Sequence, residues 1–365
     1  MTVEKVVYII GAGFSAPLGL PVVRNFIERS KDLYLSDQGR YRDFYNVFQQ
    51  IQKLSNVKNY YSADLFDIEE VLSILDLNAF ISGTGLKKEF EEYVKTVISD
   101  TTPQFVPQNR NLLSTGREVF KDERLNKYAF FVLSLFNVVP RYSIPDAKRI
   151  IPNVIRTNVE ASYDVISLNY DEILEKLSGH FLYNDRPMQF RMPGESIPEG
   201  HPIPLLAKLH GSVTSEIVPP TWRKGSKDSI VKAWEAAVHA LRSAHHIRIL
   251  GYSLPVADAY VRYLLKAAAA ESEYLKRIDV ICLDNKSGDV ERRYRDSVTF
   301  NNFRFRSLRI EDYLDPFIFV PGGRAHSGTY PNMAQRIQGA NLEGIHEQYM
   351  EKGSFTLQNH IIAPV

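Results

Sequence analysis

The sequence predicts an α/β fold: a Rossmann-like parallel sheet with helices on both faces, together with a mostly helical insertion. Two observations predict it. Five short apolar runs, rich in β-branched residues, each end in small or polar residues, as strands covered on both faces do. Helical patterns separate several of these runs, and strands that alternate with helices are typical of a doubly wound domain.

The predicted strands, in chain order, are residues 6–10, 163–168, 205–209, 247–250 and 278–283. Apolar residues at helical spacing predict helices over 22–34, 171–177, 229–244 and 255–270. Between the first two strands the same spacing predicts helices over 44–54, 68–80, 86–98 and 126–138, with a proline-containing loop over 101–117.

This pattern predicts one nucleotide domain that is split in the sequence. Residues 1–30 and 158–320 form the catalytic domain, and 31–157 form the helical insertion. Periodicity weakens after Pro321. Residues 321–365 are therefore expected to be a tail, either a mobile end or an arm that docks on another subunit.

The composition excludes several classes of protein. Forty-four Lys and Arg balance 43 Asp and Glu, so no basic face for direct nucleic-acid binding is expected. The single cysteine, Cys282, excludes an internal disulfide and a cysteine-built zinc site, and it fits a cytoplasmic protein. The uncharged stretch 6–23 is interrupted by glycines and prolines, whereas a membrane span needs about 20 continuous apolar residues. No membrane association is expected.

A glycine-rich turn, Gly11-Ala12-Gly13-Phe14-Ser15-Ala16, directly follows the first strand. It satisfies the dinucleotide-binding fingerprint, in which glycines let the backbone approach a pyrophosphate and a helix N-terminus supplies amide donors. The same turn also occurs in α/β proteins that bind no nucleotide. A dehydrogenase has a second strand that ends in an acid about 20 residues on. Here a helical pattern follows instead, so a standard dehydrogenase is disfavoured.

Polar clusters follow the other four predicted strands: Asn169-Tyr170-Asp171, His210-Gly211-Ser212, Gly251-Tyr252-Ser253 and Asp284-Asn285. The carboxyl ends of parallel strands share one edge of the sheet, where ligand sites form. Each cluster also has an ordinary structural interpretation. Asn169, Asp171 and Ser253 suit helix caps, while His210, Asp284 and Asn285 suit turns.

As a set, these motifs resemble the sirtuin superfamily. The glycine-rich turn with Gly19-Leu20-Pro21 is similar to its opening motif, and Asn169-Tyr170-Asp171 is similar to its Asn-x-Asp element. His210-Gly211 resembles the catalytic histidine-glycine pair, and the two remaining clusters resemble ribose and adenine contacts. The resemblance covers about residues 5–30 and 160–310.

The differences from deacetylating sirtuins indicate which branch of the superfamily the chain resembles. Deacetylating sirtuins carry Pro-Asp-Phe-Arg, whereas this chain has Pro21-Val22-Val23-Arg24. Their zinc module needs four cysteines, which this chain lacks. Sirtuin-like proteins without that module and with a helical insertion resemble NAD-consuming effectors of bacterial anti-phage defence. Residues 67–73 are also similar to a stretch of that insertion.

The resemblance implies an NAD glycohydrolase that uses NAD as substrate, needs no metal, and releases nicotinamide and ADP-ribose. It implies that Asn169 holds the nicotinamide ribose or the attacking water, that His210 is the general base or hydroxyl partner, and that Asp171 orients the nicotinamide side. The implied cofactor-binding residues are Gly11, Ala12, Gly13, Ser15, Pro21 and Arg24 on the phosphate side, and Gly251, Tyr252, Ser253, Asp284 and Asn285 on the adenosine side.

Constitutive loss of NAD is toxic, so regulation by assembly is expected, in a homo-oligomer built through the insertion and the tail. The resemblance also implies a co-encoded partner such as an ATPase. Two alternatives stay open: an NAD-dependent protein deacylase, which needs a groove for an acyl-lysine peptide, and a non-catalytic sensor of NAD or ADP-ribose.

Overall fold

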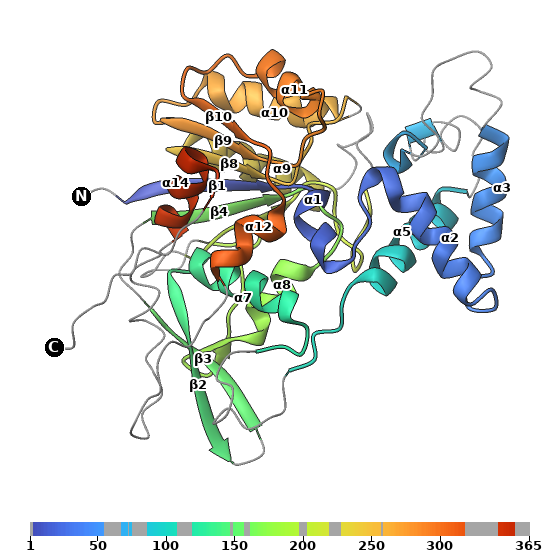
Figure 1. The fold of residues 1–365 in the computed structure, drawn as a ribbon, viewed down its shortest axis with the longest axis horizontal. Coiled ribbons are helices and arrows are strands. Elements are labelled where there is room, and N and C mark those ends of the chain that lie inside the picture. Colours follow the sequence, from blue (N-terminus) through green and yellow to red (C-terminus); the bar gives the residue numbers. More distant parts are fainter. Residues whose placement is uncertain are drawn as a thin grey trace.

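The computed structural model of the chain is drawn in Figure 1. It describes residues 3–54, 67–71, 73–74, 86–107, 119–146, 149–156, 161–196, 203–218, 228–256, 258–317 and 342–354.

A six-stranded sheet forms the centre of the molecule, and each neighbouring pair of its strands is parallel. Its order is β10-β9-β8-β1-β4-β7, so the chain builds outward from β1 to one side and then returns to build from β1 to the other. The predicted α/β class is confirmed. The strands are β1 (Glu4–Ile10), β4 (Ala161–Ser167), β7 (Leu206–Lys208), β8 (His246–Leu250), β9 (Arg277–Ile281) and β10 (Phe303–Arg306).

Helices cover both faces of the sheet. The side chains of β1 point alternately to the two faces, and on each face they are buried in a separate core. Val7 and Ile9 pack with α9 (Asp228–Arg242), α10 (Ala259–Ala270) and α11 (Asp289–Ser297). Val6, Tyr8 and Ile10 lie in the other core. That core is covered by α7 (Glu123–Leu135), α8 (Ile173–His180), α12 (Ile310–Leu314) and α14 (Leu342–Lys352).

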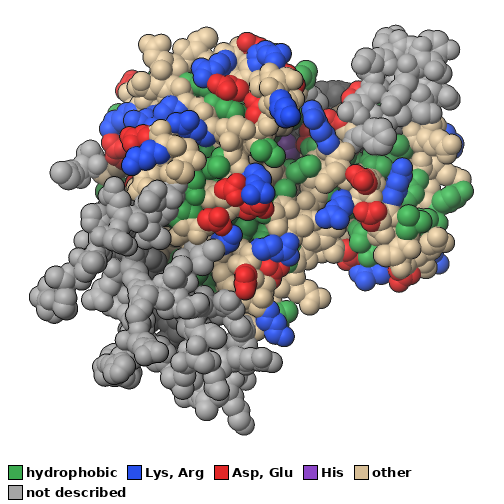
Figure 2. Space-filling model, viewed as in Figure 1, with side chains coloured by type: hydrophobic (Ala, Val, Ile, Leu, Met, Phe, Trp, Pro, Cys, Tyr) green, Lys and Arg blue, Asp and Glu red, His purple; other side chains and the backbone are tan. Residues whose placement is uncertain are grey.

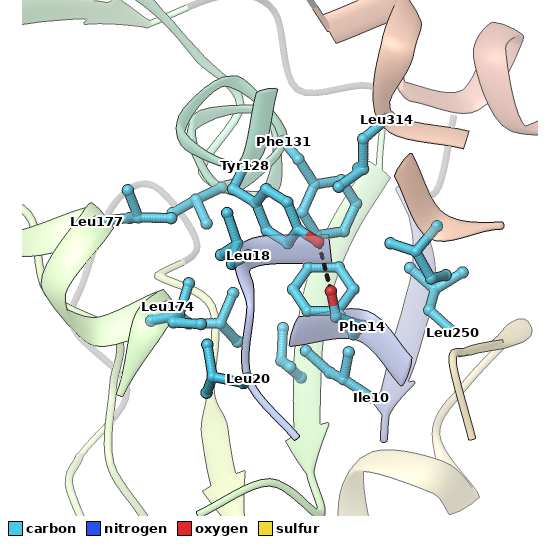
Figure 3. Close-up of a cluster of buried hydrophobic side chains, with 14 of the residues drawn as sticks. Ile10, Phe14, Leu18, Leu20, Tyr128, Phe131, Leu174, Leu177, Leu250 and Leu314 are labelled. Carbon is cyan, nitrogen blue, oxygen red and sulfur yellow. Dashed lines mark hydrogen bonds between the residues drawn. The ribbon is translucent and has the colours of Figure 1, made fainter. Parts of the chain in front are cut away.

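Helix α7 anchors the turn that follows β1. In Figure 3, Phe14 of the short helix α1 (Ala12–Ser15) lies among side chains of α7. The Tyr128 hydroxyl donates to the Phe14 carbonyl at 2.5 Å, and the two rings meet edge to face at 5.0 Å. A helix from the segment expected as an insertion therefore packs on the sheet itself. The boundaries 31–157 stay a prediction.

A lobe at the right of Figure 1 contains α2 (Phe26–Ser36), α3 (Phe44–Leu54) and α5 (Leu86–Thr101). Aromatic side chains hold it together: the rings of Phe44 and Tyr93 meet at 4.8 Å, and the Tyr93 hydroxyl donates to Ser30. Two 3₁₀ turns, η1 (Ala16–Leu18) and η2 (Val23–Asn25), join it to α1. Of the helix predicted over 68–80, residues 68–71 and 73–74 are helical and the rest lie outside the described residues.

A second, four-stranded sheet was not predicted. Its order is β2-β3-β5-β6. The helix predicted to run to residue 138 ends at Leu135, and Asn137 adopts a φ of 53° that redirects the chain into β2. The strands are β2 (Val138–Asp146), β3 (Arg149–Arg156), β5 (Leu182–Tyr183) and β6 (Arg186–Pro187). Residues 102–107 of the predicted loop contain no helix, and 108–118 lie outside the described residues.

Helix α14 corrects the expectation that residues 321–365 form only a mobile end or an arm for another subunit. It is buried on the chain's own sheet. Glu343 forms an ion pair at 2.5 Å with Arg248 of β8, which is only 1% exposed, and a buried guanidinium needs such a partner. Glu347 pairs with Arg277 and Arg304. Figure 2 shows basic and acidic side chains gathered at the upper left of the molecule, the side on which Figure 1 draws β9, β10 and α14.

His346 of α14 makes the stability of this arrangement depend on pH. Its ring bonds Asp279 and the Tyr313 hydroxyl, and Arg304 binds the same Asp279 carboxylate. Burial, and after it the charge of Arg248, lower the pKa of His346 to about 4. The unfolded chain takes up this proton near pH 6.5, so the folded state loses stability as the pH falls from 6.5 towards 4.

We expect the free energy of unfolding to fall by up to about 1.4 kcal/mol per pH unit in this range from His346 alone. Urea unfolding at pH 7, 6 and 5 measures it. The variant His346→Gln removes the titrating group and should flatten the dependence; an equally steep dependence in that variant would assign it to other groups.

No helix within the described ranges is long and apolar enough to span a membrane.

Candidate active site

The glycine-rich turn after β1 packs directly against the end of β8. The amides of Gly11 and Gly13 donate to the carbonyls of Leu250 and Gly251 at 3.0 and 2.8 Å. A Cβ on Gly13 would lie 2.7 Å from the Gly251 carbonyl oxygen, and one on Gly11 would lie 2.7 Å from the Tyr252 Cβ. The glycines are therefore required by contact between two backbones. This contact lies where the strand order reverses, the position at which open α/β sheets bind ligands.

The same hydrogen bonds limit how the turn can bind a phosphate. The amides of Gly11, Gly13 and Phe14 all donate to carbonyls of the chain itself. Ala12 begins α1 beside them. That this turn binds a pyrophosphate remains a prediction, and the presence of the glycines is explained without it.

Gly251→Ala is expected to destabilise the fold by about 2 to 5 kcal/mol. Gly251 has a φ of +64°, and a Cβ there would lie 2.3 Å from the Phe14 amide nitrogen. The matched control is Gly288→Ala, with a φ of +67° but no neighbour within 4 Å, which should cost only about 1 kcal/mol. Urea unfolding of both variants measures the difference, and equal losses would mean that the close approach of the two backbones is not needed.

Three of the predicted residues meet in one buried hydrogen-bonded chain. The Ser15 hydroxyl donates to Asp171 Oδ2 at 2.7 Å and accepts from Asn169 Nδ2 at 3.1 Å. Because a serine has one hydroxyl proton, Ser15 cannot donate to a phosphate while it binds Asp171. Its role in this structure is to fix the side chains that follow β4. Asp171 Oδ1 also accepts the amide of Ile173, the first residue of α8, at 3.1 Å, although the N-cap position of α8 is Glu172.

Asn169 keeps one polar atom unused. Its Oδ1 is buried and accepts no hydrogen bond from the described residues. A buried acceptor without a partner costs about 1–3 kcal/mol, so its presence calls for an explanation. Since the amide nitrogen is held by Ser15, the available atom is an acceptor, which suits an O–H donor such as a sugar hydroxyl or a water.

A buried lysine that sequence analysis missed supports the same segment. Lys208, the last residue of β7, donates from Nζ to the Asp171 carbonyl and lies 3.0 Å from Glu175 Oε1. Burial raises the pKa of Glu175, and Lys208 opposes that shift. The pair ties β7 to the segment that carries Asn169 and Asp171. Nothing in the local sequence distinguishes Lys208 from an ordinary strand lysine.

His210 lies just after β7, in a turn whose next residue has to be a glycine. Gly211 has a φ of +77°, and a Cβ there would overlap the Glu216 carbonyl. The His210 side chain is 2% exposed, and its Nε2 lies 3.7 Å from Asp258 Oδ2. The ring of Tyr170 lies 6.1 Å away, centroid to centroid. The structure thus brings His210 beside two residues that the predicted site did not include.

The end of β8 is held by phenols and an arginine. Burial raises the pKa of Tyr252 well above its ordinary value, and its hydroxyl donates to Asp258 Oδ2 at 2.9 Å. The Tyr294 hydroxyl donates to the Tyr252 carbonyl at 2.8 Å, and the Nε and Nη2 atoms of Arg293 both donate to the Ser253 carbonyl. Tyr252 therefore connects the end of β8 to the surroundings of His210.

Asp284 and Asn285 serve local structure at the start of α11. The Asp284 carboxylate accepts the amides of Asn285, Val290 and Glu291. Burial alone raises the pKa of Asp284, but these amides outweigh it and the pKa lies below its ordinary value. Asn285 Oδ1 bonds the amides of Ser287 and Asp289. Their interpretation as turn residues is confirmed, and a contact with adenosine stays a prediction.

The two remaining predicted residues lie between η1 and α2. Pro21 is buried and Arg24, within η2, is exposed. Their roles towards a phosphate stay predictions. Across the described part of the chain, no group of three or more His, Cys, Asp or Glu side chains could hold a metal ion.

Part of the chain is similar to a known family of domains. Residues 164–304, from within β4 to within β10, match the family model of the SIR2-like domain. No match was found among curated proteins. Similar solved structures include one from a study of the mechanism and regulation of Sir2 enzymes, with 13% identity, a TM-score of 0.36, and coverage of 87% of this chain and 92% of that one.

Another is a Sir2 bound to acetylated peptide, with 12% identity, a TM-score of 0.37, and coverage of 86% and 92%. The resemblance that the motifs predicted is thus matched by an independent family model over the part of the sheet that carries Asn169, Asp171, His210 and Tyr252. From β4 to β10 the chain is similar to the SIR2-like domain.

Proposed function

We propose that the protein is an NAD glycohydrolase that cleaves the nicotinamide–ribose bond and releases nicotinamide and ADP-ribose. Similarity to the SIR2-like domain supports NAD-dependent activity in general. The observation that carries the proposal is the buried Oδ1 of Asn169, which has no hydrogen-bond partner among the described residues and is held beside Ser15 and Asp171 at the carboxyl edge of the sheet. A buried acceptor there suits the hydroxyl of a ribose or a water molecule.

The residues at the carboxyl edge of the sheet have separate roles in this reaction. Breaking the bond leaves an oxocarbenium-like centre on the ribose, with nicotinamide as the neutral leaving group. Asn169 Oδ1 orients a ribose hydroxyl or the attacking water, and Ser15 holds the amide in place. His210 takes the proton that water loses as its oxygen bonds the ribose carbon. Asp171, fixed by Ser15 and the α8 amide, orients the nicotinamide side.

Incubation of the protein with NAD, with nicotinamide release followed by chromatography, tests the proposal. Release without any peptide supports the hydrolase. Release only when an acetylated lysine peptide is added would replace it with a deacylase. Binding of NAD with no release, at every protein concentration and assembly state tried, would replace it with a sensor.

We further propose a cytoplasmic anti-phage effector that is active as a homo-oligomer, with a partner such as an ATPase. Uncontrolled NAD loss harms the cell, and control through assembly avoids it. Light scattering coupled to gel filtration, with activity assayed across the same concentrations, tests this part. Full activity in a monomeric fraction would contradict regulation by assembly while leaving the hydrolase in place.

A further inference from the structure

We infer that Asp258 is the positioning residue of His210: its carboxylate faces one nitrogen of the imidazole ring, and this ring becomes positively charged when His210 accepts a proton. The inference rests on the proposed function for its consequence in catalysis, but not for its geometry. Asp258 Oδ2 lies 3.7 Å from His210 Nε2, and both side chains are at most 2% exposed. That separation exceeds a direct hydrogen bond but is within the distance of an ion pair.

The carboxylate is fixed from two directions. Oδ1 accepts the amide of Val261 at 3.4 Å, which caps α10. Oδ2 accepts the Tyr252 hydroxyl at 2.9 Å, and Tyr252 is itself held by the Tyr294 hydroxyl at its carbonyl. The Asp258 carboxylate therefore has a defined place between the end of β8 and the end of β7.

Capping of α10 explains only half of this arrangement. A cap needs one oxygen and is usually near solvent, where serine or asparagine serves as well. Burying a whole carboxylate is costly unless its charge has a use or a partner. The second oxygen points to such a use, because an imidazolium at His210 would be stabilised by a carboxylate at this distance.

Other groups around His210 act in the same direction. Tyr170, whose ring neighbours His210, and Tyr252 are buried phenols whose pKa values are raised first by burial. The charges of Asp258 and Glu69 raise both further. Glu69 comes from the described segment 67–71 of the expected insertion. Acids from two parts of the chain therefore act on the phenols beside His210.

Burial on its own would make His210 a poor base, as it does for His346, whose pKa falls to about 4. At His346 the bonded Asp279 is also bound by Arg304, and Arg248 lies close enough to lower the pKa. At His210 the facing carboxylate accepts hydrogen bonds from a phenol and an amide. Asp258 thus places a negative charge beside the His210 ring, which favours the protonated form of that ring.

The test measures His210 directly, in protein labelled with ¹³C at the histidine ring, by NMR titration. The His210 signal is assigned by its loss in His210→Gln. In Asp258→Asn, which keeps a good helix cap, the pKa of His210 should fall by about 1 to 3 units. Asp258→Ser, which also caps, should give the same shift and serves if the first variant does not fold. An unchanged pKa in the folded variant would overturn the inference.

Asp122→Asn is the matched control, since Asp122 caps α7 through the Arg124 amide; it should leave the pKa of His210 unchanged. The titration needs no catalytic activity, so it stands apart from the fate of the proposed hydrolase. If NAD cleavage is observed, the acidic limb of the kcat/KM profile should move by the same amount in Asp258→Asn. A purely structural role for Asp258 would lower activity without moving that limb.

Discussion

Replacing His210 by alanine is expected to lower NAD cleavage by about 10²–10⁴-fold, the usual contribution of a general base. The side chain lies at the carboxyl end of β7 with a buried carboxylate, Asp258, 3.7 Å from its Nε2. Removing the ring removes the proton acceptor and leaves that carboxylate facing a cavity. Initial rates of nicotinamide release over a range of NAD concentrations give kcat and KM, and we expect the loss in kcat.

Two controls separate chemistry from folding. His239→Ala changes an exposed histidine on α9 and should leave the rate unchanged. His210→Gln retains much of the volume and should keep the native circular dichroism spectrum while losing the rate. Near-normal turnover in either folded His210 variant would remove this residue from the mechanism.

The strands of the central sheet were predictable because burial on both faces leaves a nearly continuous apolar run. β1 is an example, with five buried residues at its end. β10 was missed for the opposite reason. It alternates Phe303 and Phe305 with Arg304 and Arg306, since it is an edge strand whose arginines bind α14. Alternation in four residues is too short a signal to separate from a loop.

Helix α14 was missed because its buried face is partly charged. Glu343, His346 and Glu347 bind Arg248, Asp279 and Arg304 on the sheet. A sequence pattern counts these residues as polar and predicts an exposed tail. Their burial depends on partners that lie far away in the sequence, which periodicity cannot detect.

The residues of the candidate site were likewise predicted only in part. Motifs that follow strands predicted Ser15, Asn169 and Asp171, and the structure joins them through hydrogen bonds. Asp258 and Lys208 were not predicted, because their roles depend on contacts with residues that lie far away in the sequence. The glycines were predicted to let the backbone approach a pyrophosphate, and in the structure they let two backbones meet at the end of β8.

Asn169→Ala is expected to reduce NAD hydrolysis to the background rate while part of the affinity for NAD remains. The change removes Oδ1, which accepts no hydrogen bond within the part of the chain that the structure describes, and with it the acceptor that orients a ribose hydroxyl or water. The Ser15–Asp171 hydrogen bond does not involve Asn169, so the neighbouring structure should persist. Calorimetric titration with NAD and nicotinamide release, measured on the same preparation, give the two quantities.

The size of the expected loss follows from orientation. A water or hydroxyl held in the reacting geometry is worth several kcal/mol relative to a free one, and alanine offers nothing to hold it. Asn302→Ala is the matched control. The Asn302 side-chain amide also donates one hydrogen bond, to the Lys276 carbonyl, and it lies at the opposite end of the strands, before β10. That variant should hydrolyse NAD at the normal rate. Unaltered kinetics in Asn169→Ala would defeat the role assigned to its oxygen, whereas loss of binding together with turnover would make Asn169 a binding residue only.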